Sequence, residues 1–533
     1  MPMNRTKGKV RAAYYMTAIK ENRMRLLKMP TMLPVLAAMA ALAAFPALGR
    51  ALAYSGPTPV GYEPRFEPAP CPEEFPLPKA ARCGFLVVPE NRGKPASRTI
   101  RLAVAIVPAV AKEPAPDPLV HLTGGPGGVA IAESQRLVAA GFNQNRDLIL
   151  MNQRGTFLSE PALTCPVIDA FNRRLLGLRY DAESTQRLHV AATRACREEL
   201  VARGVDLGAY NTTENAADFA DLRRALGYEQ YNVFGVSYGT DLALRLINDH
   251  PEGIRSIILD STVPPHVVSL PEFWPNARDG FQNLFRACFA QADCRTSFPR
   301  LEETFTQLVQ TLESQPARTT VTDPQSGEPI DVVIDGGALA NWLVAMSFET
   351  PSYKDVPSWI AELAAGKSES IATSRVGLVT APGFVGYGLT FGAICSEWFP
   401  FGTEREVLAE GRQVLPRYPR SVLAQPPQFT YMFDDCRVWN VPAAPASVRE
   451  PTRSDVPTLI LSGTFDAVTP LAWAYAASET LPNSRIVQIP GVGHFVAPES
   501  ACAQSVIASF LEQPDAPDTS CVASLKPLPF LTP

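Results

Sequence analysis

Short apolar runs rich in β-branched residues alternate with helical patterns from about residue 84, and no other feature restricts the fold as strongly. Strands that are apolar along their whole length belong to a sheet buried on both faces, and alternation with helices is typical of parallel sheets. The pattern therefore predicts an α/β fold with helices on both faces of a mostly parallel sheet. The expected strands are 84–90, 99–109, 118–123, 147–152, 230–235, 255–260, 457–463 and 484–491, and the expected helices are 183–203, 214–226, 239–249, 470–481 and 499–512.

The alternation stops near residue 265 and resumes only at residue 457. Residues 265–450 are aromatic, rich in proline and mostly helical in pattern, with no run of strands. One α/β domain with a long insertion explains this arrangement better than several separate domains. We expect a core of residues 54–264 and 451–533, a helical cap of residues 265–450, and an irregular stretch at 54–80.

Residues 1–53 have the composition of an export signal. Basic side chains crowd residues 1–28, residues 29–49 carry no charge, and Ala51-Leu52-Ala53 is a sequence of the kind that signal peptidase accepts. The alternative is an uncleaved membrane anchor, since the apolar stretch approaches spanning length, although its prolines disfavour a regular helix. We expect an exported protein, periplasmic or extracellular, with anchoring through this segment as the alternative.

Cysteine usage agrees with export. The chain has ten cysteines, and an even number beyond an export signal indicates disulfides. The sequence leaves the pairing open, and we expect neighbours along the chain to pair. No CxxC pair occurs and the histidines do not cluster with the cysteines, so no metal site is expected. The cysteines are Cys71, Cys83, Cys165, Cys196, Cys288, Cys294, Cys395, Cys436, Cys502 and Cys521.

The net charge restricts the choice of partner. The chain carries a formal charge of −5, so it has no basic surplus with which to neutralise a phosphate backbone. A nucleic-acid partner is therefore not expected, and the sequence indicates no obligate protein partner.

The segment Gly235-Val236-Ser237-Tyr238-Gly239 directly follows an apolar strand pattern and opens a helical one. In that context G-x-S-x-G marks a turn so sharp that only glycine fits on either side, with the serine hydroxyl at its tip. An ordinary tight turn is the alternative. We interpret Ser237 as a nucleophile.

A nucleophilic serine needs a base, and the base needs an acid that orients it. His494 lies in a glycine-flanked loop after the strand 484–489 and is the expected base, whereas His250 ends the helix after the serine and His266 opens the insertion. Asp466 follows the strand 457–463, one helix and one strand before His494, and is the expected acid. Its rival is Asp260, at the end of another strand.

Two backbone N–H groups should stabilise the oxyanion that forms during acyl transfer. The glycine-rich turn after the strand 118–123 supplies one; because Pro126 has no N–H, the donor there is Gly124 or Gly125, and we choose Gly125. Tyr238, directly after the serine, supplies the other. The same turn partly matches a dinucleotide-binding fingerprint, but it follows a later strand and contains a proline. No cofactor is therefore expected.

Several segments occur in a specific order and spacing over most of residues 70–525. They are CGFLVVPEN (83–91), TGGPGG (123–128), NQRGTFLS (152–159), GVSYGT (235–240), ICSEWFP (394–400), CRVW (436–439), GTFDAVTP (463–470) and GVGHFV (491–496). Together they resemble the exported α/β-hydrolases of the prolyl iminopeptidase and tripeptidyl aminopeptidase family, with its TAP-like C-terminal region. One departure is Thr123, where iminopeptidases commonly show histidine, which places strict proline specificity in doubt.

The resemblance implies an α/β-hydrolase fold with a helical cap over the catalytic face, and cleavage of short N-terminal units from peptides. It carries over Ser237, Asp466 and His494 as the triad. It also implies three of the disulfides, which are 71–83, 395–436 and 502–521.

An enzyme that removes N-terminal units must hold a free amino group, and a buried ammonium requires a carboxylate. A Cys395–Cys436 bond would tether Glu397 near the segment that carries Asp434 and Asp435. We therefore expect Glu397 and Asp435 to bind substrate within an acidic cluster beneath the cap. The alternative for Glu397 is an exposed acid beside a structural disulfide.

Two further residues are singled out. Trp398 could line an apolar substrate pocket, with the core of the cap as the alternative. Arg154 is expected to brace the loop after its strand, with a direct role in substrate binding as the alternative.

The sequence therefore predicts a secreted serine exopeptidase that releases an amino acid to a tripeptide from peptides with a free amino terminus. The alternatives are a secreted carboxylesterase acting on small acyl esters, which uses the same groups, and a non-catalytic envelope protein that keeps the fold for binding.

Overall fold

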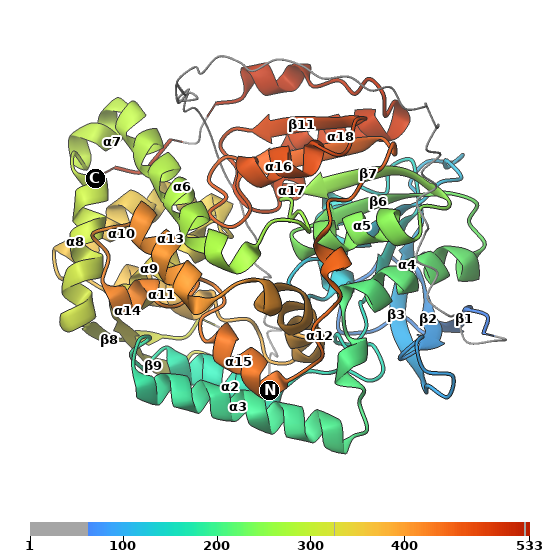
Figure 1. Ribbon diagram of the computed structural model, residues 1–533. Helices are drawn as coiled ribbons and strands as arrows, with labels where there is room; N and C mark the ends of the chain where they lie inside the picture. Colours follow the sequence, from blue (N-terminus) through green and yellow to red (C-terminus); the bar gives the residue numbers. More distant parts are fainter. Residues whose placement is uncertain (1–61, 325, 527–528, 533) are drawn as a thin grey trace, which may run out of the picture.

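The computed structural model describes residues 62–324, 326–526 and 529–532, so the expected export signal lies outside the described residues. Its centre is a nine-stranded sheet in the order β1-β2-β3-β5-β4-β6-β7-β10-β11 (Figure 1). From β5 to β11 neighbouring strands are parallel, whereas β1, β2, β3 and β5 pair antiparallel. The strands are β1 (Arg65–Ala69), β2 (Arg82–Pro89), β3 (Thr99–Val107), β4 (Leu119–Leu122), β5 (Leu148–Met151), β6 (Tyr231–Val236), β7 (Ile254–Asp260), β10 (Thr458–Gly463) and β11 (Ser484–Ile489).

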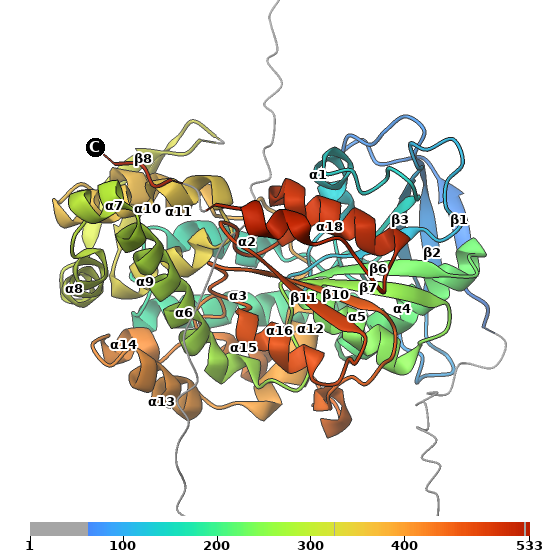
Figure 2. The same ribbon diagram turned by 90° about the horizontal axis from the view of Figure 1, so that it is seen from above.

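Helices cover both faces of this sheet, as the alternation predicts (Figure 2). Because successive side chains of a strand point to opposite faces, Val233 of β6 joins one apolar core and its neighbour Phe234 joins the other. The first core includes side chains of α4 (Thr212–Leu226), α5 (Tyr238–Asp249) and α16 (Leu471–Ser478). The second includes side chains of α1 (Ser134–Ala139), α17 (Val496–Glu499) and α18 (Ala501–Glu512).

Two expectations about secondary structure are wrong. The stretch 54–80 is not irregular throughout, because β1 lies within it and pairs antiparallel with β2. The insertion does contain strands, since β8 (Ala317–Thr322) and β9 (Pro329–Ile334) form an antiparallel hairpin. The exposed, alternating side chains of β8 lack the continuous apolar run by which the core strands were recognised.

The remainder of the insertion is helical and lies at one end of the sheet (Figure 1). Two helices from before the insertion, α2 and α3, join it there: Thr193 and His189 of α3 each lie 2.7 Å from the Asp435 carboxylate of α15. The helices are α2 (Pro166–Leu175), α3 (Glu183–Ala202), α6 (Ser269–Ala290), α7 (Ala292–Ser297), α8 (Leu301–Ser314), α9 (Gly336–Met346), α10 (Val356–Ala364), α11 (Glu369–Gly377), α12 (Tyr387–Ala393), α13 (Glu404–Val414), α14 (Arg420–Leu423) and α15 (Met432–Trp439).

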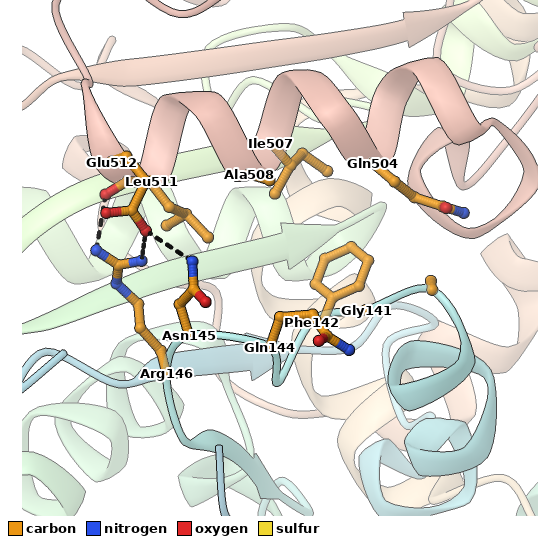
Figure 3. Close-up of a pocket in the computed structure, with 11 residues that line it drawn as sticks. Gly141, Phe142, Gln144, Asn145, Arg146, Gln504, Ile507, Ala508, Leu511 and Glu512 are labelled. Atoms are coloured by element: carbon orange, nitrogen blue, oxygen red, sulfur yellow. Dashed lines mark hydrogen bonds and ion pairs between the residues drawn. The ribbon is translucent and has the colours of Figure 1, made fainter. Parts of the chain in front are cut away.

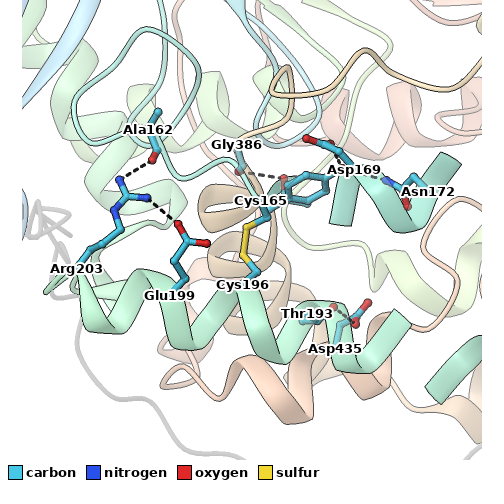
Figure 4. The surroundings of a disulfide bond; sticks show 12 residues. Ala162, Cys165, Asp169, Asn172, Thr193, Cys196, Glu199, Arg203, Gly386 and Asp435 are labelled. Carbon is cyan, nitrogen blue, oxygen red and sulfur yellow. Dashed lines mark hydrogen bonds and ion pairs between the residues drawn. A yellow bond between two sulfur atoms is a disulfide. The ribbon is translucent and has the colours of Figure 1, made fainter. Parts of the chain in front are cut away.

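Five disulfides pair the cysteines in neighbouring order along the chain. The Cys165–Cys196 bond joins the start of α2 to α3 (Figure 4). Such a density of disulfides suits an oxidising compartment and therefore an exported protein. Within the described ranges, no helix combines the length and the apolar character needed to cross a bilayer. The other bonds are Cys71–Cys83, Cys288–Cys294, Cys395–Cys436 and Cys502–Cys521.

A small surface pocket lies between α18 and the loop that precedes β5 (Figure 3). The Arg146 guanidinium closes one end, donating to Glu512 over 2.5 Å and to the Leu511 carbonyl over 2.9 Å. Phe142 and Ile507 line the same pocket and belong to the second apolar core. The arrangement fastens the last helix to the sheet.

Candidate active site

The chain turns sharply between β6, which ends at Val236, and α5, which begins at Tyr238. Ser237 stands at this turn with φ 56° and ψ −126°, a conformation that L-residues rarely adopt. A side chain at Gly239 would overlap the Leu122 carbonyl oxygen, and one at Gly235 would overlap the carbonyl oxygen of Gly239. Both glycines are therefore required for the serine to be held at the tip of the turn.

The structure brings together the imidazole and the carboxylate that were expected to pair. His494 Nδ1 lies 2.9 Å from Asp466 Oδ2, and both residues are almost completely buried. Asp466 also accepts the backbone N–H groups of Val468 and Thr469 over 2.9 and 2.8 Å. Burial alone would raise the pKa of Asp466, but His494 together with the hydroxyl and the N–H of Thr469 holds it below its ordinary value. An ionised Asp466 keeps the proton on Nδ1, so Nε2 carries the lone pair.

Asp260, the rival acid, serves the loop instead of the imidazole. Its carboxylate accepts the N–H groups of Val496 and Ala497, both over 2.8 Å, directly after His494. Its carbonyl oxygen accepts the Ser237 N–H over 3.0 Å. Asp260 therefore joins the turn that carries the serine to the loop that carries the histidine, a role that sequence reasoning missed.

The glycine-rich turn after β4 packs directly against the serine. A Cβ at Gly124 would stand 2.8 Å from Ser237 Cβ and 3.3 Å from Ser237 Oγ, so only glycine permits this approach. Among the described residues, no protein acceptor receives the N–H of Gly125. That N–H and the N–H of Tyr238, at the start of α5, are the donors expected at the oxyanion.

Buried side chains fix the start of this turn. The Glu133 carboxylate accepts from the Thr123 hydroxyl and lies 2.9 Å from His121 Nε2. Gln153 Nε2 donates to the Thr123 carbonyl over 2.8 Å. The preorganised geometry that an oxyanion requires is thus supported from β4, β5 and the segment before α1.

The cap holds the far side of the same turn. The N–H of Gly386 donates to the Gly127 carbonyl over 2.9 Å, and the Thr390 hydroxyl donates to the Pro126 carbonyl over 2.7 Å. Sequence reasoning missed both contacts, because nothing in the sequence near Gly386 or Thr390 indicates a partner about 260 positions away.

The cap also covers the histidine. The N–H of His494 donates to the Ser347 carbonyl over 3.1 Å, just after α9. The ring of Phe348 meets the imidazole edge-on, with 5.3 Å between ring centroids. These contacts exclude water from one side of the imidazole and thereby strengthen its hydrogen bond with the acid.

The side chain of Glu397, in the cap, contacts Thr212 at the start of α4, close to the turn that carries the serine. Only 4% of its surface is exposed, and it accepts the N–H of Thr212 over 2.8 Å and the Thr212 hydroxyl. That hydroxyl also lies 2.9 Å from the Tyr238 hydroxyl. Burial, reinforced by the nearby Asp241 carboxylate, raises the pKa of Glu397 to about 7. Glu397 is thus linked through one hydroxyl to the residue that follows the nucleophile.

The expected acidic cluster does not form, because its members have separate partners. Asp435 is engaged by His189 and Thr193, and Asp434 is engaged by Gln186 and Arg437. The Cys395–Cys436 bond does bring its two helical segments together. Side chains two positions apart on a helix do not face the same way, so the bond at residue 395 does not direct residue 397 toward α15.

Trp398 and Arg154 belong to the packing of the fold. The Trp398 ring lies 6.4 and 5.7 Å from the rings of Phe273 and Phe429, within the cap core. The Arg154 guanidinium is fully buried and pairs with Asp218 over 2.8 Å, which braces the loop after β5 as expected. In the part of the chain that the structure describes, no three His, Cys, Asp or Glu residues could together hold a metal ion.

A serine at a strand-to-helix turn, a histidine paired with a buried aspartate and a glycine-rich turn beside the serine are the features expected of a serine hydrolase site. The chain matches the family model described as "alpha/beta hydrolase fold" over residues 117–501. This protein belongs to that family, and its fold class is the one predicted from the sequence.

Among its relatives is "Serine protease Hip1" of Mycobacterium tuberculosis, which is 25% identical over 482 residues, covering 83% of this chain and 88% of the relative. "Tripeptidyl aminopeptidase" of Streptomyces coelicolor is 30% identical over 207 residues, covering 37% of each chain. The crystal structure of a proline iminopeptidase from Mycobacterium smegmatis matches at 16% identity with a TM-score of 0.36, covering 81% of this chain and 98% of that one. The chain is therefore a hydrolase with distant similarity to serine peptidases.

Proposed function

We propose that this protein is an exported serine exopeptidase that releases short N-terminal units, from one to three residues, from peptides with a free amino terminus. The observation that carries the proposal is the 2.9 Å pair between His494 and Asp466, on a loop that Asp260 joins to the turn of Ser237. The similarity to relatives named as a serine protease and a tripeptidyl aminopeptidase supports peptides as the substrate class.

In the proposed reaction Ser237 Oγ attacks the peptide carbonyl while His494 Nε2 takes its proton. The negative charge that develops on the carbonyl oxygen is stabilised by the N–H groups of Gly125 and Tyr238. His494 then gives the proton to the leaving amine, and Asp466 stabilises the imidazolium between these steps. Water releases the acyl group from the serine by the same sequence, so no cofactor takes part.

The free amino group of the substrate needs a negative partner, and we propose Glu397 for this role. Its raised pKa means that its present surroundings compensate its charge incompletely, and an ammonium would supply the missing compensation. It is connected through Thr212 to Tyr238, beside the bond to be cleaved. Asp435 and Trp398 are not included, because both are engaged in packing the cap.

The test is a panel of aminoacyl, dipeptidyl and tripeptidyl anilides, free and N-blocked, with matching acyl esters. It is assayed on the wild type and on Ser237→Ala. We expect cleavage of free-amine anilides, no cleavage of blocked ones and loss of activity in Ser237→Ala. Glu397→Gln should raise KM for free-amine substrates. Preference for short esters, with indifference to Glu397→Gln, would identify a carboxylesterase instead. A Ser237 that no fluorophosphonate labels would indicate a protein that keeps the fold for binding alone.

A further inference from the structure

A pocket of about 490 Å³ opens in the cap, within the size range typical of ligand sites. It lies between the turn after α9 and the helices α10 and α11, which are neighbours in Figure 1. The polar and aromatic side chains that line it include Glu349, Ser352, Trp359, Glu369, Ser370 and Thr373.

The pocket begins where the cap covers the histidine. Ser347 accepts the His494 N–H and Phe348 packs against the imidazole, and Glu349 is the next residue along the chain. Since consecutive Cα atoms are about 3.8 Å apart, the backbone of Glu349 lies within about 8 Å of that of Ser347. Further along the segment, the Tyr353 hydroxyl donates to the carbonyl of Phe465, which precedes Asp466. The segment that forms one wall of the pocket therefore also carries contacts that hold the base and the acid.

The side of the imidazole on which a pocket lies determines which part of a peptide can occupy it. The imidazole must reach the nitrogen of the leaving amine in order to protonate it, so the leaving portion lies on the histidine side of the cleaved bond. A pocket lined by Glu349, the residue that follows Phe348, is thus placed for the chain that follows that bond.

The charge of the lining specifies what this chain should carry. Glu349 and Glu369 contribute carboxyl groups, and no lysine, arginine or histidine is among the described residues that line the pocket. Burial raises the pKa of Glu349 to about 7, and Arg136, whose charge opposes this shift, is already paired with Glu499. A bound cation would hold this carboxylate in its ionised form. The indole of Trp359 offers an aromatic face for the same cation.

We infer that this pocket binds the leaving portion of the peptide and favours lysine or arginine directly after the cleaved bond. The inference rests on the proposed function, because it requires an acyl-enzyme at Ser237.

Partitioning of the acyl-enzyme between water and an added amine measures this subsite directly. In that step the amine nitrogen attacks the acyl carbonyl, the bond to Ser237 Oγ breaks, and His494 carries the amine proton to the serine oxygen. The acyl-enzyme is formed from the best ester or anilide of the panel, and lysinamide is compared with norleucinamide, which has the same carbon chain without the terminal amine. We expect lysinamide to be favoured roughly fivefold, as for a partly exposed ion pair with charged hydrogen bonds.

Variants assign the preference to its residues. Glu349→Gln and Glu369→Gln should each reduce the preference for lysinamide, and Glu369→Lys should abolish it. Glu369 is exposed, so its variants keep the inference testable if Glu349→Gln does not fold. Glu328→Gln, on the exposed β8–β9 connection, is the matched control and should keep the wild-type ratio.

Equal partitioning of the two amines in the wild type would overturn this inference while the proposed function stands. A preference for lysinamide that survives in both Glu369 variants and in Glu349→Gln would overturn the assignment to this pocket. Failure of every ester and anilide to form an acyl-enzyme would overturn the inference and the proposed function together.

Discussion

Replacing Gly124 by alanine should move the glycine-rich turn after β4 away from Ser237 while leaving the side chains of Ser237, Asp466 and His494 unchanged. The added Cβ would stand 2.8 Å from Ser237 Cβ, whereas non-bonded carbons prefer about 3.5–4.0 Å. The turn must therefore retreat by about 1 Å. A donor that should lie about 2.7–3.1 Å from the oxyanion would then lie near 4 Å, beyond hydrogen-bonding range. Loss of one such donor costs about 2.7–4 kcal/mol of transition-state stabilisation, or about 10²–10³ in kcat.

The assay is kcat and KM on the best substrate of the panel, with thermal unfolding as a check on folding. Because the lost interaction forms only in the transition state, kcat should fall while KM changes little. Gly208→Ala is the matched control, since a Cβ there meets nothing closer than Pro442 Cδ at 3.7 Å. A folded Gly124→Ala enzyme with the kcat of this control would refute the placement of the oxyanion beside Gly124.

Three further predictions follow from the described contacts. Asp466→Asn should lower kcat about 10⁴-fold with little change in KM, because an amide favours the wrong tautomer of His494; a loss below about tenfold would contradict the assignment of the acid. Burial raises the pKa of Glu397 from 4.5 to about 7, so the folded chain holds this proton more tightly than the unfolded chain. The unfolding free energy of the wild type should therefore fall by up to about 3 kcal/mol as the pH rises from 4.5 to about 7. Glu397→Gln should lack this loss in urea titrations, and equal pH profiles would contradict the shift. Changing Cys165 and Cys196 together to serine should cost roughly 3–4 kcal/mol, since their bond closes a loop with a sequence separation of 31, and an unchanged Tm would argue against that bond.

Controls for the first two of these variants come from the same chain. Asp466→Asn should still react with a fluorophosphonate, although slowly, because Ser237 and the oxyanion donors are unchanged. Glu369→Gln changes an exposed carboxyl and should keep the wild-type dependence of stability on pH.

The local parts of the site could be predicted from the sequence. The turn around Ser237 requires glycine on both sides, and both glycines occur within a segment of five adjacent residues. The pairing of Asp466 with His494 follows from a spacing of one helix and one strand, because the carboxyl ends of neighbouring parallel strands meet at one sheet edge. Apolar periodicity predicted the central strands, because each such pattern lies within a single secondary-structure element.

Only the tertiary structure decided which distant groups meet. The partner of Glu397 is Thr212, 185 positions away, and the backbone N–H of Gly386 holds the Gly127 carbonyl across a still longer separation in sequence. The sequence did not predict the hairpin β8–β9, because the largely exposed strand β8 lacks a continuous apolar run. Periodicity and motifs describe the local structure of a single segment. Contacts between the cap and the sheet depend instead on how the whole chain packs. The sequence by itself therefore determined the fold class and the pairing of Asp466 with His494, and the packing of the cap determined what surrounds that pair.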